Sequence, residues 1–90
     1  MKKYTVITTV NKPTEGIRLF LDTDFIVVIV GDKKTPPDYR DLSNVVFLDV
    51  AKQKELFPEL SNIIPYNHYC RKNLGYLYAV SQGADLILDT

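Results

Sequence analysis

The chain has 90 residues, of which 46% are hydrophobic and 24% are charged, so we expect one small globular domain rather than a disordered or multi-domain chain. Its 11 basic and 11 acidic residues cancel, which excludes the strong positive field of a general nucleic-acid-binding protein. The single cysteine excludes an internal disulfide, and no apolar run reaches the roughly 20 residues that cross a bilayer. We therefore expect a soluble chain without a nucleic-acid partner, signal sequence or membrane segment, and no compartment is indicated.

The first third of the chain predicts a strand, a helix and a second strand. Residues Tyr4–Val10 are rich in β-branched and aromatic residues, which is typical of a strand, and Pro13 ends the run because proline has no N–H for a sheet. Apolar residues then recur at helical spacing between about residues 14 and 22. Phe25–Val30 is apolar without alternation, which favours a strand covered on both faces, as in a parallel sheet.

The middle third predicts a loop, a third strand and a second helix. Residues 33–42 are polar and have two consecutive prolines at their centre, which indicates a flexible loop. Val45–Leu48 has the apolar character of a short strand. Asp49 is placed to cap a helix that runs to about Leu56, and Pro58 ends this helix.

The last third predicts a linker, a longer helix and a fourth strand. Residues 61–65 form a linker whose two isoleucines we expect under the body of the domain. A helix then runs from about His68 to Gln82, with Asn67 as its N-cap and Gly83 as its stop, and Leu86–Leu88 forms the last strand. The apolar stripe of this helix consists of Cys70, Leu74 and Leu77.

This alternation of strands and helices predicts an α/β fold, a Rossmann-like three-layer sandwich with a four-stranded, mainly parallel sheet in the order 3-2-1-4. In a parallel sheet the carboxyl ends of the strands meet at one edge, where open α/β sheets bind ligands. Each strand here ends in a polar residue, which fits a ligand-binding rim and fits ordinary turns and caps equally well. Asp49 has the position of a pure cap, whereas no helix directly follows Asp32 or Asp89. The four strand-ending residues are Asn11, Asp32, Asp49 and Asp89.

Positive charges stand at two places where they could meet an anionic ligand. Arg71 and Lys72 lie at the start of the last predicted helix, where they add to the partial positive charge of the helix end. They could also decorate a solvated face. Lys33 and Lys34 lie in the loop after the second strand, where they could close over a phosphate or serve only to keep the surface soluble; we favour the second role for Lys34.

Gly75 lies inside the last predicted helix, where glycine costs about 1 kcal/mol relative to alanine. Close packing against the sheet or space for a ligand would explain it, and packing is the simpler reason. His68 and Cys70 are two residues apart and cannot share a helix face, so they do not predict a metal site.

Three blocks of the sequence follow one another in a distinctive order: Ile7–Thr14, Val30–Pro36, and Ile64–Asn67 leading into Arg71–Ala79. The last block continues through Gly83 and Ala84 to a strand that ends at Asp89. This ending is similar to the segment before the metal-binding acidic motif in glycosyltransferases of the GT-A, nucleotide-diphospho-sugar transferase fold. Together the blocks resemble the STELLO-type glycosyltransferase family along nearly the whole chain.

The resemblance implies that residues 1–90 are the nucleotide-sugar-binding half-domain of a glycosyltransferase, an incomplete GT-A fold that stops before the acceptor-binding half. It implies a pocket at the carboxyl edge of the sheet for a nucleotide sugar, UDP-linked, as donor substrate. Thr8, Thr9 and Val10 would approach the base, Asp32 would hold a base nitrogen, and Arg71 with Asn73 would flank the ribose and diphosphate. With Lys33 added from the loop, these are the predicted cofactor-binding residues, and Asp89 is the predicted ligand of a manganese or magnesium ion.

The family pattern continues after Thr90 with further acidic residues and a catalytic half. We therefore expect no catalytic residue in this chain, no activity of the chain alone, and a bound divalent cation only in the full-length parent. The alternative is a small α/β interaction or scaffold domain that binds no nucleotide. In the order 3-2-1-4 its last strand would lie at an open edge and could pair with a second copy to form a homodimer.

Overall fold

The computed structural model describes residues 1–9, 13, 15–42, 45–64 and 71–89. At its centre is a four-stranded sheet in the order β3-β2-β1-β4, in which all three neighbouring pairs are parallel. The predicted α/β fold and strand order are thus confirmed. The strands are β1 (Lys3–Thr8), β2 (Ile26–Val30), β3 (Val45–Leu48) and β4 (Leu86–Asp89).

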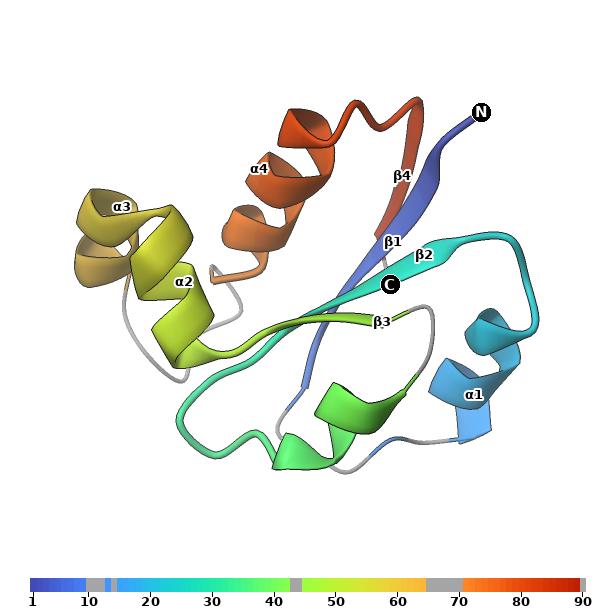
Figure 1. Ribbon diagram of the computed structural model, residues 1–90, viewed down its shortest axis with the longest axis horizontal. Helices are drawn as coiled ribbons and strands as arrows, with labels where there is room; N and C mark the ends of the chain where they lie inside the picture. The colour runs from blue at the N-terminus through green and yellow to red at the C-terminus, as the bar shows by residue number, and fades with distance from the viewer. Residues whose placement is uncertain (10–12, 14, 43–44, 65–70, 90) are drawn as a thin grey trace.

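Helices cover both faces of the sheet, which gives the predicted three layers (Figure 1). Helices α2, α3 and α4 pack over one face, and α1 with the short 3-10 helix η1 packs over the other. Among the described residues, we find no helix with the length and apolar character that crossing a membrane requires. The helices are α1 (Glu15–Leu21), η1 (Pro37–Asp41), α2 (Val50–Leu56), α3 (Pro58–Ile63) and α4 (Lys72–Ser81).

Successive side chains of the central strands point to opposite faces and build two separate cores. This arrangement explains why β2 is apolar without alternation, since both of its faces are covered. The core under α2, α3 and α4 contains Tyr4, Val6, Val28, Val30, Leu48, Leu74 and Ala79. The core under α1 and η1 contains Ile7, Ile17, Val27, Ile29 and Tyr39.

Two glycines have the structural roles that the sequence predicts. A β-carbon on Gly75 would lie 2.5 Å from Val6 Cγ1 and 2.6 Å from Val30 Cγ2, so the missing side chain lets α4 approach the sheet closely. Gly83 has a φ of 80°, a backbone conformation that glycine adopts readily, and it ends the turn that follows α4.

Two predicted irregular segments are helical instead. The predicted loop at 33–42 contains η1, because Pro37 is a favourable first residue of a helix and Tyr39 adds an aromatic ring to the core. The predicted linker at 61–65 is wrong as well, since α3 extends to Ile63. Proline explains this second error, because Pro58 both ends α2 and begins α3.

Two predicted core positions are exposed. Ile63, which we expected under the body of the domain, is 77% exposed, and Leu77 of the predicted apolar stripe is 43% exposed. Leu77 is exposed because α4 packs against the sheet with the side that carries Leu74, Gly75 and Ala79. The neighbouring Ile64 does pack against the core, as predicted.

Some predictions concern residues outside the described ranges. These are the strand end at Val10 and Asn11, the helix cap Asn67, and the roles of His68 and Cys70. Consequently the described part of the last long helix begins at Lys72. The predicted strand Tyr4–Val10 is described from Lys3 to Thr8.

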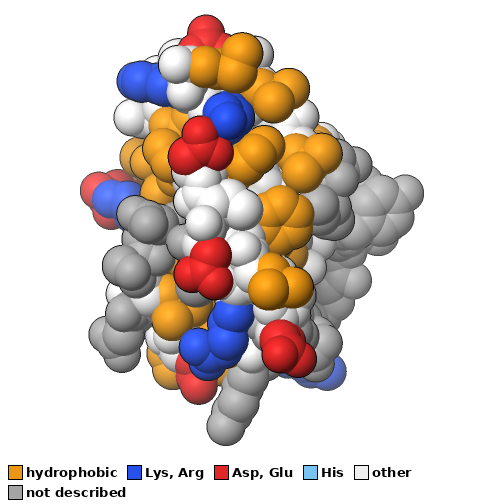
Figure 2. All heavy atoms as spheres, turned by 90° about the vertical axis from the view of Figure 1, so that its right-hand side faces the viewer, with side chains coloured by type: hydrophobic (Ala, Val, Ile, Leu, Met, Phe, Trp, Pro, Cys, Tyr) orange, Lys and Arg blue, Asp and Glu red, His pale blue; other side chains and the backbone are white. Residues whose placement is uncertain are grey.

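Charges of both signs share the face of the molecule that carries α1 (Figure 2). Figure 2 views the side that carries α1, and red, blue and orange side chains alternate over it without a region of one charge. The pattern agrees with the zero net charge of the chain. Attraction of an anionic ligand must therefore come from individual side chains at the site and not from a general field.

Candidate functional site

The carboxyl ends of β1 and β2 are joined by the side chain of Thr35, which lies in the loop after β2. Its Oγ1 donates a hydrogen bond to the carbonyl oxygen of Thr9 at 2.6 Å and accepts one from the N–H of Asp32 at 2.8 Å. The Lys33 N–H in turn donates to the Asp32 carboxylate at 2.7 Å. The structure thus brings together Thr9, Asp32 and Lys33, three of the residues that we predicted to bind a nucleotide.

A hollow of about 320 Å³ opens beside this loop, between the end of β2 and the start of α2. Asp32, Lys33 and Thr35 supply polar groups to its wall, whereas Phe47 and Val50 supply apolar surface. A few polar groups beside apolar surface are typical of small-molecule sites, and the volume lies near the lower end of their range. The complete lining is Asp32, Lys33, Thr35, Pro37, Arg40, Phe47, Asp49, Val50 and Ala51.

Arg40 and Asp49 form an ion pair at the rim of this hollow, with 2.9 Å between Nη2 and Oδ2. The other carboxylate oxygen of Asp49 accepts a hydrogen bond from the Lys52 N–H at 2.8 Å. This confirms that Asp49 is the N-cap of α2. Both of its oxygens are therefore engaged by protein groups, and Asp49 shapes the rim of the hollow.

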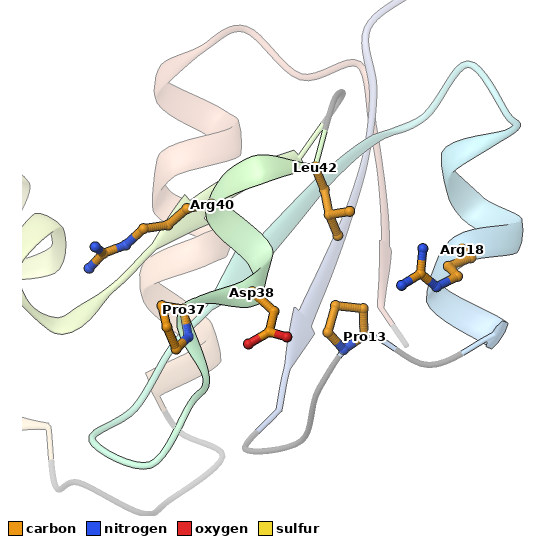
Figure 3. Close-up of a pocket in the computed structure, with 6 residues that line it drawn as sticks. All are labelled: Pro13, Arg18, Pro37, Asp38, Arg40 and Leu42. Carbon is orange, nitrogen blue, oxygen red and sulfur yellow. The ribbon is translucent and has the colours of Figure 1, made fainter.

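A second hollow of about 540 Å³ adjoins the first, since Pro37 and Arg40 line both. It lies between η1 and α1 and is lined by Pro13, Arg18, Pro37, Asp38, Arg40 and Leu42. In Figure 3 the Arg40 guanidinium points away from Arg18, toward the start of α2, where Asp49 holds it. The two arginines therefore do not converge on one point in this hollow.

Tyr39 and Thr35 support the site, and sequence reasoning missed both. Tyr39 is fully buried below the carboxyl edge, 5.8 Å from Phe47 between ring centroids. Burial raises the pKa of its hydroxyl, although a hydrogen bond with Thr9 acts in the opposite direction. The two consecutive prolines followed by an aspartate were the available signal, because this pattern begins a helix as readily as it fills a loop.

Arg71 lies directly before α4, is only 1% exposed, and donates its hydrogen bonds to protein atoms. Its Nε and Nη2 donate to Gln53 Oε1 at 3.0 and 2.6 Å, and Nη2 also donates to Ser61 Oγ at 3.0 Å. Its Nη1 donates to the carbonyls of Ser61 and Ile64 at 3.3 and 2.8 Å. Arg71 is not among the residues that line the two hollows described above. Its predicted contact with a ribose or diphosphate stays a prediction, and it would require these bonds to be exchanged.

Asn73 and Asp89 lie apart from the hollow at Asp32. Asn73 is exposed in the first turn of α4. Asp89 pairs with Val6 of β1, two residues before Thr8, which pairs with Val30 of β2. Strand geometry then puts the Asp89 backbone roughly 7 Å below the level of Val30 and roughly 10 Å across the sheet. The strand order reverses between the paired strands β1 and β4, and in such sheets the usual ligand crevice lies outside the carboxyl ends of the strands at this point.

The described residues do not form a metal-binding cluster. No group of three or more histidine, cysteine, aspartate or glutamate side chains comes together in the part of the chain that the structure describes. Magnesium and manganese take about six oxygen ligands. The described residues do not provide such a ligand set by themselves, and the role of Asp89 as a metal ligand stays a prediction.

Comparison with curated proteins finds relatives along nearly the whole chain. The chain is 33% identical over 89 residues to the probable glycosyltransferase STELLO2 of Arabidopsis thaliana and 32% identical over 89 residues to the probable glycosyltransferase STELLO1 of the same organism. Both alignments cover 98% of this chain, which spans 12% and 11% of the length of those relatives. No family model matches the chain. The resemblance to the STELLO-type glycosyltransferases is thus confirmed for the segment that they share with this chain.

Proposed function

We propose that this chain is the nucleotide-diphospho-sugar-binding portion of a STELLO-type glycosyltransferase and has the first half of a GT-A fold. The observation that carries the proposal is the similarity to two probable glycosyltransferases over 98% of the chain. The strand order 3-2-1-4 supports it, because dinucleotide-binding α/β sheets begin with the same order. The chain spans 12% and 11% of the length of those relatives, so the proposal concerns binding of the donor by this segment and not sugar transfer itself.

The base and ribose of the donor, a UDP-sugar, bind at the carboxyl ends of β1 and β2. Asp32 accepts a hydrogen bond from a base nitrogen, and Thr8, Thr9 and Val10 approach the same base. The proposal is supported by the hydrogen bond of Thr35 to Thr9, which brings the two strand ends together. It is also supported by the hollow beside Asp32, whose apolar surface suits the face of a heterocycle. Lys33 provides a positive charge for a phosphate.

The diphosphate lies outside the carboxyl ends of β1 and β4, with Asn73 at the start of α4 and Asp89 at the end of β4 on its two sides. A divalent cation neutralises a diphosphate leaving group in this kind of reaction. Because one carboxylate is a poor site, the diphosphate itself and water supply further ligands of the cation.

Titration of the chain with UDP, UDP-sugars and other nucleotides, with and without manganese, tests the proposal. In NMR spectra we expect the amide signals of Thr8, Thr9, Asp32 and Lys33 to shift. The amide signal of Lys2 provides an internal control and should not shift, because its N–H donates to Asp85 at 2.7 Å at the amino ends of the strands, opposite the proposed site. The proposal would be rejected if millimolar nucleotide produced no heat of binding and no change in these chemical shifts.

A second candidate function, a scaffold domain that pairs through its sheet edge, is favoured by the surface of β4. Leu86 and Leu88 of this strand are 45% and 40% exposed, and in the described sheet β4 pairs with β1 alone. An edge strand with apolar side chains can add to a second copy. Light scattering should then show a dimer that Leu88→Lys dissociates, whereas a monomer that binds nucleotide would reject this candidate.

A further inference from the structure

A continuous series of hydrogen bonds runs from Arg71, directly before α4, to the candidate site through the side chain of Gln53. Gln53 lies in α2 and is fully buried. Its Oε1 accepts the hydrogen bonds from Arg71 described above. Its Nε2 donates to the carbonyl oxygens of Gly31 and Leu48, each at 2.7 Å. The amide thus has its acceptor directed at Arg71 and its N–H groups directed at the ends of β2 and β3.

The two carbonyls that Gln53 binds lie where the sheet ends. The Gly31 N–H donates to the Leu48 carbonyl at 2.9 Å, which extends the pairing of β2 and β3 by one step. Beyond this point the Gly31 carbonyl has left the ladder, and a buried carbonyl without a donor is costly. Gln53 supplies the donor and so fixes the direction of this carbonyl.

The peptide bond between Gly31 and Asp32 is therefore held from both sides. Its C=O binds Gln53, and its N–H donates to Thr35 Oγ1 at 2.8 Å. Thr35 passes the series on to the carbonyl of Thr9. Because a peptide unit is planar, rotation of this one unit would break both of its bonds and move the backbone that carries the Asp32 carboxylate.

We propose that Gln53 and Arg71 are positioning residues, which hold the Gly31–Asp32 peptide in the orientation that presents Asp32 to the ligand. The proposal rests on the proposed nucleotide site for its consequence for binding. It gives Arg71 an indirect role: the guanidinium fixes the orientation of the Gln53 amide, because a flipped amide would turn Oε1 toward two carbonyl oxygens and its N–H groups toward a cation. The orientation of a buried, fully bonded amide is then determined.

The variant Gln53→Glu tests this series of hydrogen bonds, called the relay below, by removing only its donor to the two carbonyls. A carboxylate keeps an acceptor oxygen for Arg71, but its second oxygen replaces Nε2 and offers no donor to the carbonyls of Gly31 and Leu48. We expect the Asp32 amide to exchange its hydrogen at least about tenfold faster than in the native chain, and nucleotide affinity to fall by about tenfold or more. Gln82→Glu makes the same chemical change at an exposed position and provides the matched control. Unchanged exchange of the Asp32 amide in a folded Gln53→Glu variant would overturn the proposal.

Thr35 allows a test from the other end of the relay if Gln53→Glu does not fold. We expect Thr35→Val to speed exchange at the Asp32 amide and to shift the side-chain amide signals of Gln53, while Thr35→Ser restores both. If the side-chain amide signals of Gln53 do not shift in Thr35→Val, the proposed coupling between Thr35 and Gln53 is wrong. In the double variant Gln53→Glu with Thr35→Val, the combined loss of nucleotide affinity should be smaller than the sum of the two single losses, since both changes remove a hydrogen bond of the same Gly31–Asp32 peptide. Additive losses would argue against a shared effect through this peptide.

Amide exchange separates this inference from the proposed function. If the native chain binds no nucleotide but Gln53→Glu releases the Asp32 amide, the proposed function fails and the positioning role stands. If nucleotide binds but the exchange rate of the Asp32 amide is unchanged in Gln53→Glu, the positioning role fails and the proposed function stands.

Discussion

The side chain of Val6 occupies the space that a β-carbon on Gly75 would need, since the two carbon atoms would lie only 2.5 Å apart. Val30 closes the same space from the neighbouring strand, at 2.6 Å. Helix α4 therefore sits as close to β1 and β2 as the glycine allows. This contact sets the height of the whole helix over the sheet, including its first turn next to Arg71.

Gly75→Ala should destabilise the chain although alanine favours helices. The substitution gains about 1 kcal/mol of helix propensity, but overpacking against Val6 and Val30 costs about 1–3 kcal/mol. We expect a lower midpoint of unfolding in urea. The exposed helical Gly16 in α1 is the matched control, and Gly16→Ala should leave stability unchanged or raise it. A Gly75→Ala variant as stable as the native chain would contradict the close packing of α4.

Replacement of Asp49 should remove the cap of α2 and its link to η1. We expect Asp49→Ala to lower the free energy of unfolding by about 1 kcal/mol, the usual value for loss of an N-cap. Asp49→Asn keeps an oxygen for the Lys52 N–H and loses only the exposed ion pair with Arg40, so it should cost a few tenths of a kcal/mol or less. Equal losses in the two variants, measured by urea unfolding, would mean that the ion pair matters more than the cap.

The pair of Lys3 and Asp24 should contribute a loss of stability in acid. A hydrogen bond from Lys3, 2.8 Å long, lowers the pKa of the exposed Asp24 below its ordinary value, against a smaller opposing effect of burial. Because the folded pKa is lower than the unfolded value of about 3.9, this contribution is present above about pH 4 and is lost as the pH falls through the folded pKa. NMR titration should show a higher Asp24 pKa in Lys3→Met and an unchanged one in Lys2→Met. High salt should reduce the difference.

Tyr39 should make the chain sensitive to alkali. Burial raises the pKa of its hydroxyl above its ordinary value, so the neutral form is favoured in the folded chain. The contribution to stability is complete below the unfolded pKa of about 10 and is lost as the pH rises from there through the folded pKa. The stability of the native chain should therefore fall more steeply than that of Tyr39→Phe above about pH 10. Parallel pH profiles of the two proteins would contradict this assignment.

Two neighbouring lysines should differ in their effect on nucleotide binding. Lys33 lines the hollow at the carboxyl edge, and Lys34 is not among its lining residues. We expect Lys33→Ala to weaken binding of UDP about three- to fivefold, as for an exposed charge pair, and Lys34→Ala to have little effect. Isothermal titration at low salt measures the difference. Equal losses in both variants would indicate general attraction and not a phosphate contact of Lys33.

Local sequence patterns were sufficient for the architecture. The apolar run of β2 indicated a strand covered on both faces, and its position between two further strands was predicted and is confirmed. The cap at Asp49 and the stop at Gly83 were readable as well, because each depends on neighbours within a few residues. Resemblance to a family added where a ligand would bind, and the structure brings Thr9, Asp32 and Lys33 of that prediction together.

The surroundings of the polar side chains needed the tertiary structure. Arg71 looked like a surface cation at a helix start, yet it is buried against Gln53, which lies 18 residues earlier in the chain. Tyr39 looked like part of a polar loop, yet it completes a core whose other members come from β1, β2 and α1. Burial of a polar group depends on partners that satisfy its hydrogen bonds, and those partners come from distant elements. The sequence by itself therefore determined the order of strands and helices through hydrophobic periodicity, whereas only the folded chain decided which cations line a hollow, as Lys33 does, and which are buried, as Arg71 is.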